Sequence, residues 1–221
     1  MQPSPAPYRD RVDAGQTLAE SLTAWREQQP LIVGIPRGGV VVARAVAESL
    51  GAELDTVIVR KVGAPHQPEL AIGAVAPDGQ VILDYHLIER MRINERALNA
   101  LIAREQEEAR RRLLAYRGAR PPLDAADRTV IVVDDGLATG ATMAIALRVL
   151  RTHLPHLLIA AAPVGSRFAI ESLAPVADHV VCPHVPVDLV AVGGYYADFA
   201  ETTDSTVQTI LAETFQKNWM V

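Results

Sequence analysis

Residues 130–142 read Val-Ile-Val-Val-Asp-Asp-Gly-Leu-Ala-Thr-Gly-Ala-Thr, and this stretch decides the fold. Its four β-branched residues predict a buried strand, which ends in two adjacent carboxylates, Asp134 and Asp135. A turn of small residues then opens a helix, whose first amides and positive dipole end form a cradle for a phosphate. An ordinary strand–helix turn is the alternative, but such turns rarely carry two unpaired acids, because burying them is costly. Carboxylates accept hydrogen bonds from sugar hydroxyls or coordinate Mg²⁺. Together with the phosphate cradle, they predict a site for a phosphorylated sugar.

Apolar runs and helical patterns alternate along the rest of the chain. Strands are predicted at 31–35, 56–59, 157–163 and 180–181, a hairpin at 71–75 and 81–83, and helices at 38–50, 87–117 and 141–151. A first helix with a capping box from Asp13 to Gln16 precedes them, and an amphipathic helix ends the chain. This alternation predicts an α/β fold with a mostly parallel sheet covered by helices on both faces. In such sheets ligands gather at the carboxyl ends of the strands.

Two more loops are predicted to leave strands at that same edge. The first contains Arg37, Gly38 and Gly39, which supply a fork of donors and backbone amides for an anion. The second begins with Arg60 and Lys61, which put two cations at the sheet edge after a buried strand. For each loop the alternative is an ordinary surface turn with solvated cations.

Bulk properties narrow the function classes. The chain has 221 residues, a net charge of −5 and one cysteine, Cys182. The charge gives no electrostatic reason to expect nucleic acid, and no apolar run is long enough to span a bilayer. The single cysteine rules out an internal disulfide and suits a reducing cytoplasm. We therefore expect a cytoplasmic protein without a nucleic-acid or membrane partner.

The stretch 130–142 resembles the signature of the type I phosphoribosyltransferases, which bind phosphoribosyl pyrophosphate (PRPP) through an apolar strand, two acids and Thr-Gly-x-Thr. The loops at Arg37 and Arg60 resemble the pyrophosphate loop and the lid of that family, and Ala191–Phe199 resembles its hood. The resemblance implies that the lid is a mobile loop over residues 62–70. With Asp-Arg-x-Asp-Ala-Gly near residue 10, the whole pattern is most similar to bacterial members whose acceptor is unassigned. The resemblance implies one domain over 1–221, with hood elements near 1–28 and 182–221 and an inserted helix near 87–117.

The same resemblance implies Mg²⁺-dependent transfer of the 5-phosphoribosyl group from PRPP to an unidentified nucleophile, with release of pyrophosphate. Its PRPP-binding residues correspond to Asp134, Asp135, Gly136, Leu137, Ala138, Thr139, Gly140, Ala141 and Thr142. Its pyrophosphate-binding residues correspond to Arg37, Gly38, Gly39, Arg60 and Lys61. Catalysis is assigned to Asp134, Asp135, Lys61 and Glu69, with His66 as a second candidate for proton transfer. Asp198 is expected to approach the metal together with Asp134 and Asp135, and a carboxylate that caps a turn is the alternative.

Departures from the family leave the acceptor open. The 6-oxopurine enzymes place a stacking aromatic, a base-reading lysine and a loop acid where this chain has Ala191, Gly165 and Ala138. A non-catalytic sensor of PRPP or nucleotides is therefore an alternative, as is a hydrolase or phosphorylase of ribosyl phosphates.

Two features outside the loops have simpler interpretations. His179, Cys182 and His184 have zinc-like spacing, but without a fourth ligand a buried thiol beside two ordinary histidines is preferred. The charged helix at 87–117 interleaves both signs, which indicates a solvated face and an added packing element. A homodimer through that helix is one expectation.

Overall fold

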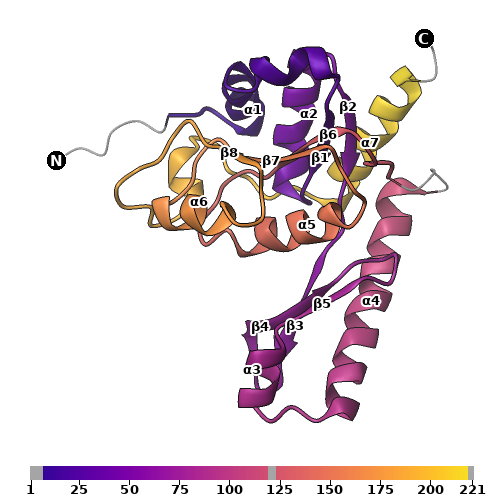
Figure 1. The fold of residues 1–221 in the computed structure, drawn as a ribbon. Coiled ribbons are helices and arrows are strands. Elements are labelled where there is room, and N and C mark those ends of the chain that lie inside the picture. The colour runs from indigo at the N-terminus through magenta and orange to yellow at the C-terminus, as the bar shows by residue number, and fades with distance from the viewer. Residues whose placement is uncertain (1–6, 119–122, 219–221) are drawn as a thin grey trace. The chain divides into compact units, whose positions relative to one another are not determined.

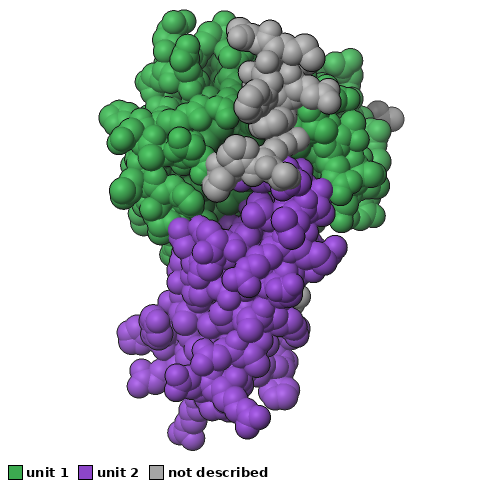
Figure 2. All heavy atoms as spheres, turned by 90° about the vertical axis from the view of Figure 1, so that its right-hand side faces the viewer, with its two compact units in different colours: residues 1–57, 121–221 green, residues 58–120 purple. Residues whose placement is uncertain are grey.

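The computed structural model describes residues 7–118 and 123–218, apart from the side chains of Glu69 and of residues 215–218. The chain forms two compact units (Figure 2). Unit 1 comprises residues 1–57 and 121–221, and unit 2 comprises residues 58–120.

Unit 1 contains a five-stranded parallel sheet in the order β2-β1-β6-β7-β8. The strands are β1 (Leu31–Gly34), β2 (Glu53–Thr56), β6 (Thr129–Val133), β7 (Leu157–Ala161) and β8 (His179–Val181). Helices α1 (Arg11–Glu20) and α2 (Gly38–Leu50) lie on one face, and α5 (Ala141–Arg151) and α6 (Arg167–Leu173) lie on the other (Figure 1). The expected α/β fold with helices on both faces is confirmed.

Local signals in the sequence explain the boundaries of these helices. Gly51 ends α2 with φ +66°, and Gly140 begins α5 with φ +75°, backbone conformations that glycine adopts without strain. The hydroxyl of Ser166 accepts a hydrogen bond from the Ala169 amide and caps α6. The last helix, α7 (Asp204–Asn218), buries Val207 and Leu211 completely, which agrees with its predicted amphipathic pattern.

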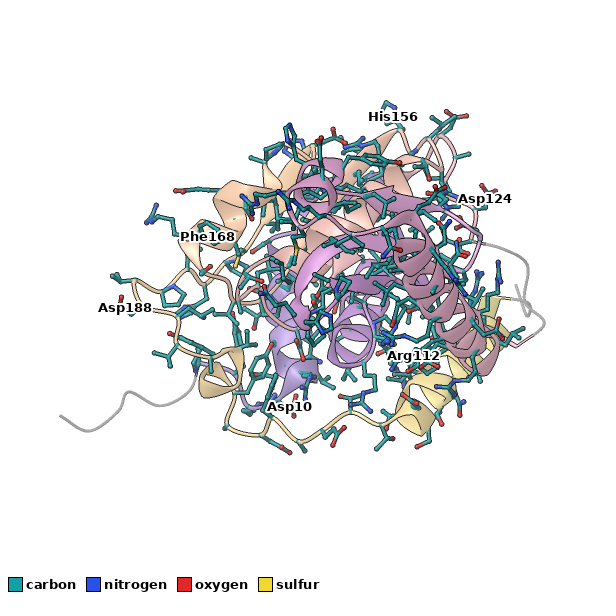
Figure 3. All side chains as sticks on the ribbon, turned by 90° about the horizontal axis from the view of Figure 1, so that it is seen from below. Asp10, Arg112, Asp124, His156, Phe168 and Asp188 are labelled. Carbon is teal, nitrogen blue, oxygen red and sulfur yellow. The ribbon has the colours of Figure 1, made fainter. Side chains whose placement is uncertain are left out.

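The start of α1 differs from the prediction. Its N-cap is Asp10, at the N-terminal end of the helix (Figure 3), and not a capping box from Asp13 to Gln16. The Asp10 carboxylate accepts hydrogen bonds from the amides of Val12 and Asp13. The Asp13 carboxylate instead pairs with Arg9, one helical turn earlier, at 2.8 Å. Two short 3₁₀ helices, η1 (Thr23–Gln28) and η2 (Val192–Tyr195), complete unit 1.

Sheet topology places the candidate site. Strands β1 and β6 are neighbours, and the helices that follow them, α2 and α5, run to opposite faces of the sheet (Figure 1). In parallel sheets, such a reversal opens a crevice at the carboxyl ends of the two strands, and ligands bind there. The loops after β1 and β6 are those that carry Arg37 and the acid pair.

Unit 2 packs an antiparallel sheet against two helices. Its elements are β3 (Arg60–Ala64), β4 (Gln67–Val75), β5 (Val81–Leu83), α3 (Tyr85–Arg90) and α4 (Glu95–Arg117). Val62, Ile72 and Val75 are completely buried between sheet and helices. Within the described residues, neither unit contains a helix long and apolar enough to cross a membrane.

Three expectations about residues 53–117 need correction. The strand expected at 56–59 is β2, which pairs with β1 over residues 53–56. The loop expected at 62–70 is a hairpin of β3 and β4, in which register shifts at Gly63 accommodate the extra residues. The single helix expected over 87–117 is divided, because Arg92 has φ +53° and Asn94 starts α4 as its N-cap.

Candidate active site

The loops after β1 and β6 touch through two glycines. A Cβ atom on Gly38 would lie 1.9 Å from Oδ2 of Asp135, and one on Gly39 would lie 2.8 Å from Cα of Asp134. Real side chains do not approach backbone or carboxylate atoms so closely, so only glycine permits this arrangement. The structure therefore brings together the predicted pyrophosphate loop and the predicted sugar-binding acids.

The acid pair is held by hydrogen bonds to one oxygen of each carboxylate. The amide of Asp135 donates to Oδ1 of Asp134 at 2.9 Å, and Nε of Arg11 donates to Oδ2 of Asp135 at 2.8 Å. Burial, and the neighbouring Asp135 carboxylate, raise the pKa of Asp134 well above its ordinary value. Two acids of one sequence motif thus stand in different environments: Asp135 is paired with a cation, and Asp134 has no such partner among the described residues.

The rest of the signature loop is anchored at Leu137. Its amide donates to the Val164 carbonyl and its carbonyl accepts from the Ser166 amide, both at 2.9 Å. The side chain of Leu137 is buried, while Ala138 and Thr139 are exposed. Thr142, in the first turn of α5, is exposed as well. The residues at the start of α5 are therefore exposed, and the Ala141 amide donates to the Thr139 hydroxyl at 3.4 Å.

Segments from the two ends of the chain pair beside the acid pair. Tyr8 forms a bridge with Tyr196, and the Asp198 amide donates to the Arg9 carbonyl at 2.8 Å. The Tyr196 hydroxyl donates to the backbone carbonyl of Asp135 at 2.6 Å. Burial, and the nearby Asp135 carboxylate, raise the pKa of Tyr196, so this hydroxyl stays protonated as a donor.

Arg37 stands at the start of α2, after a cis peptide bond with Pro36. Its Nη2 atom lies 2.5 Å from Oε1 of Glu201, and its Nη1 atom lies 3.9 Å from Oδ1 of Asp204. The guanidinium is partly exposed and paired with carboxylates from the segment that leads into α7. It is therefore accessible to an anion that competes with those carboxylates.

Asp198 shows the turn geometry that was the alternative to a metal ligand: its Oδ1 accepts the amide of Ala200 at 2.9 Å. No group of three potential metal ligands occurs among the described residues. Mg²⁺ is commonly held by one or two carboxylates together with substrate phosphates, so the carboxylates of the acid pair fit an ion that arrives with a diphosphate. The assignment of Asp134, Asp135 and Asp198 to a metal stays a prediction.

The remaining predicted site residues belong to unit 2. Nε and Nη2 of Arg60 donate to Oε2 of Glu105 at 3.0 and 2.7 Å, an ion pair that the sequence pattern did not indicate. Lys61 is exposed on β3, and His66 lies in the turn between β3 and β4 with φ +64°. Glu69 lies in β4, and its side chain falls outside the described residues. The roles given to Arg60, Lys61 and Glu69 stay predictions.

The carboxyl ends of β7 and β8 are closely packed. A Cβ on Gly165 would lie 3.1 Å from both Sγ of Cys182 and Cβ of Leu137. Burial raises the pKa of Cys182 to about 11. The rings of His184 and Tyr195 are 5.2 Å apart, and those of His179 and Trp25 are 5.5 Å apart. Within the described residues no group of three potential metal ligands includes these histidines and the thiol.

Arg11, Tyr196 and Phe199 are site residues to which the sequence analysis assigned no role. The Arg11 guanidinium carbon lies 3.8 Å from the centre of the Phe199 ring, and its Nε binds Asp135. Arg11 and Tyr196 lie in two stretches that the resemblance singled out, Asp-Arg-x-Asp-Ala-Gly and Tyr-Tyr-x-Asp-Phe. Their contact with residue 135 has no local signal in the sequence.

Comparison with known proteins agrees with this geometry. The family model of the phosphoribosyl transferase domain matches residues 9–185. A crystal structure of the protein TT1426 from Thermus thermophilus is 45% identical, covers 93% of this chain and 98% of that one, and superposes with a TM-score of 0.84.

Two Mycobacterium tuberculosis proteins, named "Putative phosphoribosyl transferase Rv0571c" and "Putative phosphoribosyl transferase MT0597", are each 38% identical over 204 residues. The aligned region is 92% of this chain and 46% of each relative, so the chain spans about half the length of these curated relatives. The match over residues 9–185, with the acid pair and its loop inside it, shows that the chain belongs to the phosphoribosyl transferase domain family.

Proposed function

We propose that this chain transfers the 5-phosphoribosyl group from PRPP to a nucleophile and releases pyrophosphate. One observation carries the proposal: the start of α2 and the loop that opens α5 flank a single pair of carboxylates at the switch point of the sheet. PRPP has the matching charge pattern, with a phosphate at one end, a pyrophosphate at the other and neutral hydroxyls between them. Helix N-termini bind anions, and carboxylates accept hydrogen bonds from hydroxyls.

Each group then has a defined task. The 5-phosphate binds to the amides of the loop over 136–142, except that of Leu137, which donates to the Val164 carbonyl. The start of α2 with Arg37 binds the pyrophosphate. Asp134 and Asp135 hold the ribose hydroxyls, and their negative charge stabilises the positive charge that grows on the ring as the pyrophosphate leaves.

Three roles rest on the family resemblance alone. Arg60 and Lys61 stabilise the departing pyrophosphate, and Glu69 removes the proton of the nucleophile. Asp198, together with the acid pair, approaches Mg²⁺, which when bound offsets the charge of the pyrophosphate. The PRPP-dependent turnover of a Glu69→Gln variant tests the proton transfer, and unchanged turnover removes Glu69 from that role.

The proposed function is tested by incubating the protein with Mg²⁺, PRPP and a pool of cellular metabolites and measuring pyrophosphate release. We expect release that depends on the pool and is lost in an Asp134→Asn variant. PRPP binding without release supports the sensor instead. Release that needs no acceptor supports a hydrolase.

A further inference from the structure

Arg11 connects three parts of unit 1. Its Nε atom donates to Oδ2 of Asp135 at 2.8 Å, and its Nη1 atom donates to the carbonyl of Ala200, also at 2.8 Å. Its guanidinium carbon lies 3.8 Å from the centre of the Phe199 ring, close enough for a cation–π contact. The side chain is only 12% exposed. Three directed contacts on a buried guanidinium leave it little freedom to move.

These contacts fix the position of Asp135 in particular. The backbone carbonyl of Asp135 accepts the Tyr196 hydroxyl, and Gly38 lies directly against Oδ2 of its side chain. Arg11 donates to that same oxygen, so Asp135 is held both at its backbone carbonyl and at one oxygen of its carboxylate. The neighbouring Asp134 carboxylate accepts the Asp135 amide, and the described residues form no ion pair with it, although Arg11 is close enough to lower its pKa slightly against the larger effect of burial.

A carboxylate that already pairs with a guanidinium, as Asp135 does, favours a neutral hydrogen-bond donor over a cation. Its second oxygen still accepts a hydrogen bond from a neutral hydroxyl. A divalent cation on the same carboxylate is disfavoured, because the guanidinium already offsets its charge and repels a second cation. The two acids of the pair are therefore not equivalent.

We propose that Arg11 is a positioning residue, which fixes Asp135 to accept a hydrogen bond from a ribose hydroxyl of the donor and disfavours a metal ion there. This inference rests on the proposed function and refines it. It leaves Asp134 and Asp198 as the carboxylates that approach Mg²⁺.

Binding of two small phosphate compounds distinguishes a role of Arg11 in positioning Asp135 from a role in stabilising the loop as a whole. Ribose 5-phosphate carries the ring hydroxyls, and tetrahydrofurfuryl phosphate has the same ring and phosphate without them. We would measure binding of both by calorimetry, in magnesium-free buffer, to the wild-type chain and to the Arg11→Ala and Arg11→Lys variants. Arg9→Ala is the matched control, since Arg9 lies on the same segment, is 80% exposed and pairs with Asp13.

We expect the Arg11→Ala substitution to weaken the binding of ribose 5-phosphate by about tenfold, which is roughly the contribution of one charge-assisted hydrogen bond. The affinity for tetrahydrofurfuryl phosphate should stay unchanged. Arg11→Lys keeps the charge and should recover part of the loss, and Arg9→Ala should match the wild type. An equal loss for both phosphates would mean that Arg11 only supports the loop, and no loss would mean that Asp135 needs no such partner; either result overturns the inference. A wild-type chain that binds neither phosphate contradicts the proposed function itself, and the inference with it.

Discussion

Nη2 of Arg37 lies 2.5 Å from Oε1 of Glu201, so the arginine assigned to pyrophosphate is paired with a carboxylate from the segment before α7. The Glu201 side chain is 76% exposed, and exposed ion pairs of this kind contribute only about 0.2–1 kcal/mol. A pyrophosphate group, with more charge than one carboxylate, competes well for the same guanidinium.

The Glu201→Gln variant should bind pyrophosphate more tightly than the wild type, by up to about fivefold. Arg37 then no longer exchanges one anion for another. Calorimetric titration with pyrophosphate measures the change. Glu213→Gln is the control, because Glu213 pairs with Arg44 instead of Arg37. Unchanged or weaker binding in Glu201→Gln would separate Arg37 from pyrophosphate recognition.

The Gly38→Ala variant should lose both stability and ribose 5-phosphate binding. Its Cβ atom would lie 1.9 Å from Oδ2 of Asp135, so the acid must move, at a cost of about 1–3 kcal/mol. Gly194→Ala is the matched control, since no atom lies within 4 Å of a Cβ at that position. Urea unfolding measures the stability of both variants, and titration measures their ribose 5-phosphate binding. A Gly38→Ala variant that matches the control in both would contradict the close contact.

The Glu105→Gln variant should destabilise unit 2 at neutral pH. Glu105 is buried, and Arg60 and Arg104 donate to its two carboxylate oxygens, so the change leaves buried donors poorly paired and costs about 1–3 kcal/mol. Urea unfolding at pH 7 measures the loss. Glu107→Gln is the control, because the Glu107 side chain is 80% exposed.

The same variant gives a pH dependence with a definite sign. Burial raises the pKa of Glu105, but the hydrogen bonds from Arg60 and Arg104 outweigh it and hold the pKa below its ordinary value. A lowered native pKa contributes stability above the ordinary carboxyl pKa and loses it as the pH falls through the lowered one. The difference between wild type and Glu105→Gln in urea unfolding should therefore shrink on acidification. A difference that stays constant would mean that the ion pair does not form.

Cys182 should react slowly with thiol reagents in the folded protein. Burial raises its pKa to about 11, so at pH 8 about one thiol in a thousand is the reactive thiolate. It is the only cysteine in the chain, so a disulfide reagent reports on it alone. The rate should rise with pH and increase sharply in urea; equal rates in native and unfolded protein would contradict the burial.

The position of the acid pair and its loop could be predicted from sequence because its determinants are local. Asp134 and Asp135 follow a buried strand and precede a helix, so strand, acids and cradle lie within thirteen consecutive residues. The position of the Arg37 loop beside the acid pair could be predicted as well, because neighbouring parallel strands bring their carboxyl ends together. The contact between Gly38 and Asp135 required the structure.

The parts that sequence reasoning missed depend on long-range contacts. Arg11 and Asp135 are 124 residues apart, and Arg60 and Glu105 are 45 residues apart, so no local pattern connects them. The family resemblance predicts a mobile lid over residues 62–70, where the structure has the hairpin of β3 and β4. Its strands form by pairing with each other and by packing apolar side chains against the helices of unit 2.

The contact of Gly38 and Gly39 with the acid pair also has an evolutionary consequence. Residues 38 and 39 and residues 134 and 135 are about a hundred positions apart in the sequence, yet no side chain fits between them. A substitution in one loop is therefore tolerated only with a compensating change in the other. The two loops should vary together or not at all, and an acceptor of any new chemistry should evolve elsewhere in the chain while this pair stays fixed.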